Sequence, residues 1–217
     1  LAAPLPHNGL ADRMTTEQAK LRAEGLFRYT DQIVDIGRGV GEHLTLVGIS
    51  AGGLATGWAA QQRQGIDRAV LISPGFGFKV VPAPLTALVS RAVILLPNRY
   101  IWNDTELEAN SSPDHNYPRI STRALGQILR LSLATQALMR QKAPAASSIL
   151  VITNLDDQGV DNGAIGKVVD LWRLHGAAVE TYQFPADLHL PHGLIDPQEP
   201  GQNIAVVYPR LLELIDR

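Results

Sequence analysis

The segment Gly48-Ile-Ser50-Ala-Gly52 constrains the fold of this chain more than any other stretch. It follows an apolar run of strand character, residues 44–49, and precedes an Ala- and Gly-rich stretch that can start a helix. A serine between two glycines at such a junction is typical of a tight strand-to-helix turn that exposes the hydroxyl group. We expect glycine at 48 and 52 because larger side chains would clash there. The pattern predicts that Ser50 is a catalytic nucleophile.

Apolar runs alternate with segments of helical periodicity over most of the chain. This alternation predicts a parallel sheet that is covered by helices on both faces, and therefore an α/β fold. The expected strands are residues 44–49, 68–73, 148–153 and 178–184, and the expected helices are residues 15–36, 54–64, 161–175 and 204–215.

Residues 76–146 interrupt this alternation, because prolines break them up and they hold no clear strand. Helical spacing of apolar residues recurs at 85–96 and at 121–142, and Ser121 is a plausible helix cap. We interpret residues 76–146 as an inserted helical cap on a core formed by residues 1–75 and 147–217. Leu85, Leu88 and Val89 are candidates to line an apolar substrate pocket over Ser50, or simply to pack their helix on the domain.

A serine hydroxyl is a poor nucleophile at neutral pH and needs a base, which in turn needs an orienting acid. In a strand-turn-helix context the acid and then the histidine follow the serine in the chain. Three aspartates follow the expected strand 148–153. Asp161 suits a helix cap, and we favour Asp157 over Asp156 because Val160 can anchor the loop while the Asp157 carboxylate points to the strand end.

The loop after the last expected strand holds two histidines, His189 and His192. His192 precedes a glycine in the stretch that feeds the final helix, where the base is needed, so we favour it. His189 could face solvent or contact substrate. The remaining histidines have weaker cases.

Composition excludes several classes of function. The chain has no cysteine, and no histidine pair has the spacing of metal ligands on a helix, so we expect no metal site. A net charge of −2 with scattered Lys and Arg gives no nucleic-acid footprint. No apolar run approaches the ~18 residues of a membrane-spanning helix. The sequence leaves the oligomeric state and the compartment open, and slightly favours the cytoplasm.

Taken together, these residues resemble the α/β-hydrolase superfamily, in particular bacterial carboxylesterases and monoacylglycerol-lipase-like serine hydrolases. The resemblance covers nearly the whole chain. It rests on the Ser50 segment, on Leu5-Pro6-His7-Asn8-Gly9, on Leu71-Ile-Ser-Pro-Gly75 and on the positions of Asp157 and His192. It implies that Ser50 attacks an ester carbonyl, that His192 carries the proton and that Asp157 orients His192, with no cofactor.

The resemblance also implies that the first strands of the fold precede Leu1, so that the N-terminal part of the sheet is absent from this chain. The backbone N–H of Ala51 would give one oxyanion-hole donor, and the second would normally come from the absent part. The loss of one such donor typically costs about 10²–10³ in rate. We expect the absent segment to lie upstream in the native protein, to be supplied by another chain, or to be cut away and still bound, because an open apolar edge strand aggregates.

We therefore expect a serine hydrolase that cleaves carboxylic esters, either of short or medium acyl chains or monoglycerides, through an acyl-enzyme. Its partner would be a small-molecule ester. Other serine chemistries of the fold remain open, including thioester, lactone and acyl-transfer reactions. The rival class is a non-catalytic or ligand-binding protein on the same scaffold.

Overall fold

A computed structural model of the 217-residue chain describes residues 1–102 and 116–216. The described strands are β1 (Thr45–Ile49), β2 (Arg68–Ile72), β3 (Tyr100–Trp102), β4 (Arg119–Ser121), β5 (Ser148–Asn154) and β6 (Val179–Phe184). The α-helices are α1 (Ala23–Val40), α2 (Ala51–Gln62), α3 (Thr86–Leu95), α4 (Thr122–Met139), α5 (Asn162–Leu174) and α6 (Ile204–Ile215). Three short 3₁₀ helices, η1 (Glu17–Lys20), η2 (Ala83–Leu85) and η3 (Ala186–Leu188), complete the described elements.

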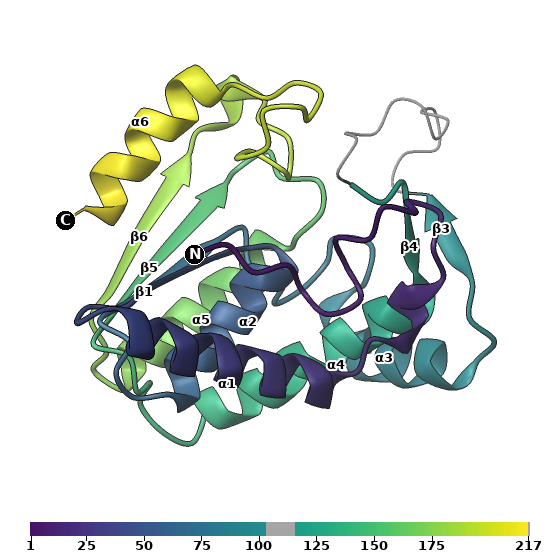
Figure 1. Ribbon diagram of the computed structural model, residues 1–217, viewed down its shortest axis with the longest axis horizontal. Helices are drawn as coiled ribbons and strands as arrows, with labels where there is room; N and C mark the ends of the chain where they lie inside the picture. Colours follow the sequence, from purple (N-terminus) through teal and green to yellow (C-terminus); the bar gives the residue numbers. More distant parts are fainter. Residues whose placement is uncertain (103–115, 217) are drawn as a thin grey trace.

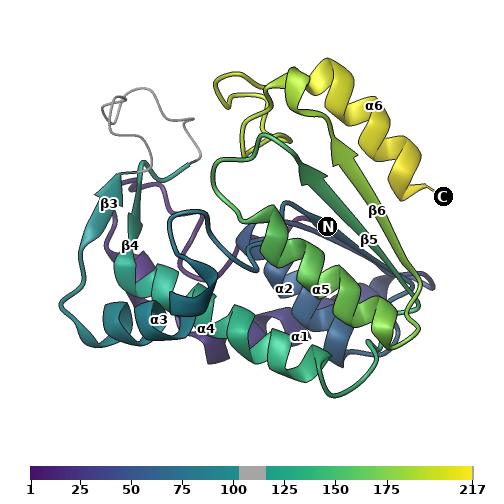
Figure 2. The ribbon, with the colours of Figure 1, turned by 180° about the vertical axis from the view of Figure 1, so that it is seen from behind.

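The main sheet has the strand order β1-β2-β5-β6, and all of its neighbouring strands are parallel. Helices connect its strands and cover both faces, so the predicted α/β architecture is confirmed. In Figures 1 and 2, α1, α2 and α5 lie on one side of the sheet and α6 lies on the other. The carboxyl ends of the parallel strands therefore meet at one edge, where loops from β1, β5 and β6 can come together.

Alternate residues of the central strands enter two different apolar cores, as the two-residue period of a strand requires. Leu71 of β2 and Val151 of β5 pack with α2 and α5, whereas Ile72 and Ile152 pack with α6. These four side chains are at most 2% exposed. The two central strands are thus buried on both faces of the sheet.

The region between β2 and β5 contributes buried side chains to the apolar core that also holds α2 and α5. Helix α4 begins after Ser121, whose side chain accepts a hydrogen bond from the Ala124 N–H at 3.2 Å, as the sequence predicts. Leu131 and Met139 of α4 are buried in the same core as α2 and α5. The expected cap, residues 76–146, includes residues 103–115, which lie outside the described part of the chain.

This region also contains the antiparallel pair β3–β4, which the sequence pattern did not predict. Each strand has only three residues, so the alternation that identifies a longer strand cannot develop. Helix α3 packs against α4 at Gly126, where an added Cβ would lie 2.6 Å from the Val93 side chain.

Candidate active site

Ser50 occupies the turn between β1 and α2, with a left-handed backbone φ of 53°. Its N–H donates to the Ile72 carbonyl of β2 at 3.0 Å, and its carbonyl accepts the first helical hydrogen bond, from the Leu54 N–H at 2.9 Å. The N–H groups of Ala51 and its two successors precede that first helical bond, so they have no acceptor within the helix. The turn thus combines a strained serine with free helix N–H groups, as a nucleophile turn requires.

The glycines around Ser50 differ in how tightly they are packed. A Cβ added at Gly48 would lie 2.3 Å from the Gly52 carbonyl oxygen, so position 48 requires glycine. An added Cβ at Gly52 would meet nothing within 4 Å, so the predicted clash at this position is wrong. Gly53 is the second crowded position, because its added Cβ would lie 3.0 Å from the Pro74 backbone. The sequence pattern thus predicted the turn and the crowding at Gly48, but it placed the second crowded position at Gly52 rather than at Gly53.

Asp157 lies in the loop after β5 and is completely buried. Its Oδ1 accepts hydrogen bonds from the backbone N–H groups of Gly159 at 2.8 Å and Val160 at 3.1 Å. Val160 is itself buried, as expected of the residue that anchors this loop. The following Asp161 accepts from the Gly163 N–H at 2.8 Å and caps α5, as the sequence predicts.

His192 comes from the long loop between β6 and α6 and joins Asp157 to Ser50. Its Nδ1 atom lies 2.9 Å and 3.0 Å from the two carboxylate oxygens of Asp157. Its Nε2 atom lies 2.8 Å from the Ser50 Oγ. A carboxylate only accepts hydrogen bonds, so Nδ1 carries the proton and Nε2 is free to accept from the hydroxyl of Ser50. The three side chains therefore form one continuous hydrogen-bonded chain.

The surroundings of Asp157 favour its ionised form. Burial alone would raise the pKa of its carboxyl group, because it disfavours the charged state. The hydrogen bond and charge of His192, together with the two backbone N–H donors, outweigh burial and hold the pKa below its ordinary value. Asp157 thus remains a carboxylate that can orient an imidazole at neutral pH.

The two rejected candidates form a second pair beside this chain. Asp156 Oδ2 lies 3.3 Å from His189 Nδ1, and the His189 side chain is largely exposed. Neither residue has a described hydrogen bond to Ser50. The geometry thus brings Asp157 and His192, rather than Asp156 and His189, to the serine.

The three expected substrate-binding residues have no described hydrogen bond to Ser50, His192 or Asp157. Leu85 ends η2 and Leu88 lies on α3, and these side chains are 47% and 65% exposed, while Val89 is half-buried. Their role in binding an acyl group stays a prediction.

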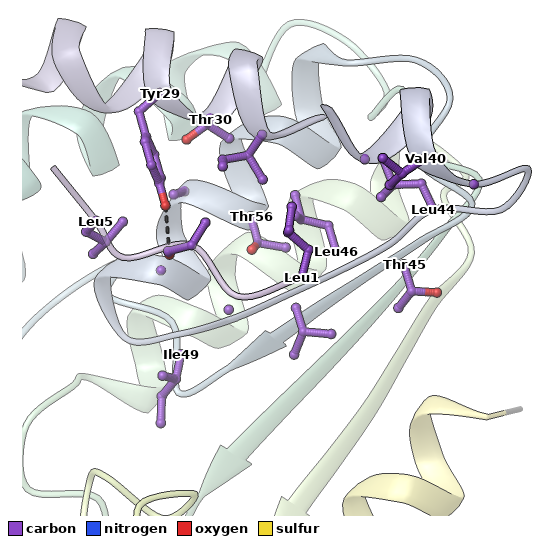
Figure 3. A pocket seen from close by; sticks show the side chains of 18 of the residues that line it. Leu1, Leu5, Tyr29, Thr30, Val40, Leu44, Thr45, Leu46, Ile49 and Thr56 are labelled. Carbon is purple, nitrogen blue, oxygen red and sulfur yellow. Dashed lines mark hydrogen bonds between the residues drawn. The ribbon is translucent and has the colours of Figure 1, made fainter. Parts of the chain in front are cut away.

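A cavity of about 770 Å³ lies along the outer edge of β1. Figure 3 shows that β1, α1 and the first residues of the chain line it, with the Tyr29 hydroxyl hydrogen-bonded to the Ala3 carbonyl at 2.7 Å. The lining includes Gly48 and Gly52 but not Ser50 or His192. Val47, at the middle of this edge strand, is 47% exposed. The cavity therefore borders the Ser50 turn at Gly48 and Gly52.

Within the described ranges, no three His, Asp or Glu side chains form a group that could hold a metal ion. In the same ranges, none of the helices combines the length and apolar character needed to cross a bilayer.

Two residues near the site carry no sequence signal that predicts a role for them. Asn154, the last residue of β5, hydrogen-bonds to both the Asp157 loop and the His192 loop. A Cβ added at Gly159 would lie 3.1 Å from His192 Cγ. Each lies within five residues of Asp157, but neither forms part of a recognisable motif.

Comparison with known proteins gives one family match and many structural ones. The family described as alpha/beta hydrolase matches residues 2–93, which include the Ser50 turn. No curated protein matches the chain.

Among solved structures, a metagenome-derived lipolytic enzyme from the study of LipS and LipT is similar, with a TM-score of 0.63 and 20% identity over 97% of this chain and 79% of its own. A monoacylglycerol lipase from Paleococcus ferrophilus matches with a TM-score of 0.60 and 17% sequence identity, over 90% of this chain and 75% of the lipase. A monoglyceride lipase from Saccharomyces cerevisiae matches with a TM-score of 0.66 and 12% sequence identity, over 98% of this chain and 76% of the lipase.

Identities this low establish the fold and nothing finer. The chain has the α/β-hydrolase fold: a mostly parallel sheet flanked by helices, with the Ser50 turn at the carboxyl end of β1. Its structural neighbours include lipases and esterases.

Proposed function

We propose that this protein is a serine hydrolase that cleaves carboxylic esters of short or medium acyl chains, or monoglycerides. The observation that carries the proposal is the chain of hydrogen bonds from Ser50 Oγ through His192 to Asp157, at 2.8 Å and 2.9 Å. Asp156 and His189 have no part in this chain. The lipase and esterase neighbours support the choice of ester substrates.

In the proposed reaction, His192 Nε2 takes the proton of Ser50 as Oγ attacks the ester carbonyl carbon. Asp157 stabilises the resulting imidazolium through its hydrogen bond to Nδ1. His192 then gives the proton to the alcohol oxygen as the carbon–oxygen bond of the ester breaks, which leaves an acyl group on Ser50. A water molecule attacks that acyl group by the same route and releases the acid.

The negative oxygen that forms during each attack needs hydrogen-bond donors. We assign one donor to the backbone N–H of Ala51, at the first position of α2. We propose that a second donor comes from a further segment, upstream or on another chain, beside the outer edge of β1. The open space next to Gly52 is compatible with such a neighbour.

Hydrolysis of p-nitrophenyl esters of increasing acyl length tests the proposal. Wild-type protein should release p-nitrophenol, and Ser50→Ala should remove this activity almost completely. Ser147→Ala is the matched control, because Ser147 is exposed and precedes β5 at the opposite end of the sheet. Equal rates for wild type and Ser50→Ala would rule the proposal out.

A further inference from the structure

Asn154 has a buried amide side chain at the point where the loop that carries Asp157 and the loop that carries His192 leave the sheet. It is the last residue of β5 and pairs with Phe184, the last residue of β6. Its side chain is 0% exposed. Burial of an amide group costs free energy unless its donors and acceptors are hydrogen-bonded. The hydrogen bonds of Asn154 therefore identify the segments that it joins.

The amide nitrogen of Asn154 holds the loop that carries His192. Nδ2 donates to the Leu190 carbonyl at 2.6 Å, and the Pro191 carbonyl lies 3.4 Å away. These carbonyls belong to the two residues that immediately precede His192. Leu190 is itself buried under α6, so this end of the loop is fixed on two sides.

The oxygens of Asn154 hold the loop that carries Asp157. Oδ1 accepts from the Asp156 N–H at 3.1 Å, and the backbone carbonyl accepts from the Asp157 N–H at 3.2 Å. The same carbonyl also accepts from the Asn162 side chain at 2.8 Å, at the start of α5. One residue therefore binds both loops.

We propose that Asn154 is a positioning residue that sets the distance and orientation between His192 and Asp157. An amide suits position 154, because it donates to one loop and accepts from the other in a single planar group. The inference rests on the proposed function, in which the His192–Asp157 pair acts on Ser50. Asn154 itself contacts none of the three side chains in the described hydrogen bonds.

The substitution Asn154→Asp tests this role sharply. Aspartate has the same shape and keeps the acceptor for the Asp156 N–H, but it replaces the donor to Leu190 with an oxygen that faces a carbonyl oxygen. The loop that carries His192 should therefore move, while the loop that carries Asp157 keeps its position. Asn154→Ala removes both contacts and provides a second variant, in case one of the two does not fold.

Gln61 offers a matched control, because it is also a buried amide that joins two segments. Its Nε2 donates to the Lys142 carbonyl at 3.0 Å, and its Oε1 accepts from Trp172 at 2.9 Å. It lies eleven residues after Ser50 on α2, which places it roughly 16 Å along the helix from the turn. Gln61→Glu makes the same chemical change far from the site.

Two readouts separate positioning from stability: steady-state kinetics on a p-nitrophenyl ester, and the low-field proton resonance of His192 Nδ1–H, assigned by its loss in Asp157→Asn. We expect Asn154→Asp to lower kcat about tenfold to hundredfold, as small misplacements of catalytic groups do, with little change in KM. The resonance should shift or broaden. Folded Gln61→Glu should keep both readouts, even if its Tm falls.

Wild-type kcat and resonance in folded Asn154→Asp or Asn154→Ala would overturn the positioning role, as would equal losses in Gln61→Glu. If wild-type protein hydrolyses no ester, the resonance alone decides. A shift in Asn154→Asp but not in Gln61→Glu would then support positioning while the proposed function fails.

Discussion

The Nε2 atom of His192 lies 2.8 Å from the Oγ atom of Ser50, although 142 positions separate the two residues in the chain. Their meeting follows from the parallel sheet, because β1 and β6 both end at the same edge, on either side of β2 and β5. The Asp157 loop leaves the sheet between them. A left-handed turn, a buried carboxylate and a partly exposed imidazole thus converge at one point.

Replacement by asparagine should have very different effects on catalysis at the two neighbouring aspartates. Asp157→Asn keeps the size of the side chain but removes the carboxylate that fixes the His192 tautomer. We expect kcat for ester hydrolysis to fall about 10⁴-fold, the typical cost of such a change in a serine triad. Asp156→Asn should change kcat little, because Asp156 pairs with the exposed His189. The reverse order of effects would make Asp156 the acid.

The lowered pKa of Asp157 also predicts how stability depends on pH. A carboxyl whose pKa is lower in the folded state binds fewer protons there, so its ionised form stabilises the fold. This contribution is complete above its unfolded pKa of about 3.9 and is lost as the pH falls through the folded pKa. Urea unfolding should therefore show the stability advantage of wild type over Asp157→Asn shrinking below about pH 4. If the difference in the free energy of unfolding between wild type and Asp157→Asn stays constant from neutral pH to pH 3, the pKa of Asp157 is not lowered in the folded state.

Gly159 should be sensitive to the smallest possible enlargement. An alanine methyl at this position would lie 3.1 Å from His192 Cγ and 3.2 Å from His192 Nδ1. We expect Gly159→Ala to push the imidazole away from Ser50 and to lower kcat about tenfold to hundredfold. The matched control is Gly166→Ala on α5, where an added Cβ meets nothing within 4 Å. Unchanged kcat in Gly159→Ala would show that the loop around Gly159 accommodates the methyl group without displacing His192.

The two glycines of the Ser50 segment should respond in opposite ways to alanine. Gly48→Ala forces a Cβ to 2.3 Å from the Gly52 carbonyl, so we expect a loss of about 1–3 kcal/mol or more in the free energy of unfolding. In the 217-residue chain, where no further segment can fill the space next to Gly52, Gly52→Ala in α2 should be neutral or gain up to about 1 kcal/mol from helix propensity. Thermal unfolding of both variants checks this contrast. A large loss in Gly52→Ala would mean that something fills that space.

Much of the fold could be predicted because its long elements carry strong local signals. The terminal helix at 204–215 and the caps at Ser121 and Asp161 follow from periodicity and from side chains that accept N–H bonds. The sequence could predict that Ser50, Asp157 and His192 lie close together, because parallel strands end at one edge of the sheet. The order of serine, acid and histidine along the chain then left few other residues as candidates.

The remaining features depend on contacts between distant segments, which local patterns do not encode. The strands β3 and β4 form because two three-residue segments meet, and the burial of Met139 depends on where α4 packs. The roles of Asn154 and Gly159 follow from loops that approach one another only in the folded chain. Crowding at Gly53 rather than Gly52 likewise depends on where Pro74 lies.

The most direct test of the central claim is covalent labelling by a fluorophosphonate, read by intact mass and by peptide mapping. The reagent reacts with a serine whose hydroxyl is activated by a neighbouring base. We predict one added group per chain, located on Ser50, with labelling lost in Ser50→Ala and strongly slowed in His192→Ala. Ser147→Ala should label at the wild-type rate. Folded protein that takes up no label, or takes it up on another residue, would contradict the account.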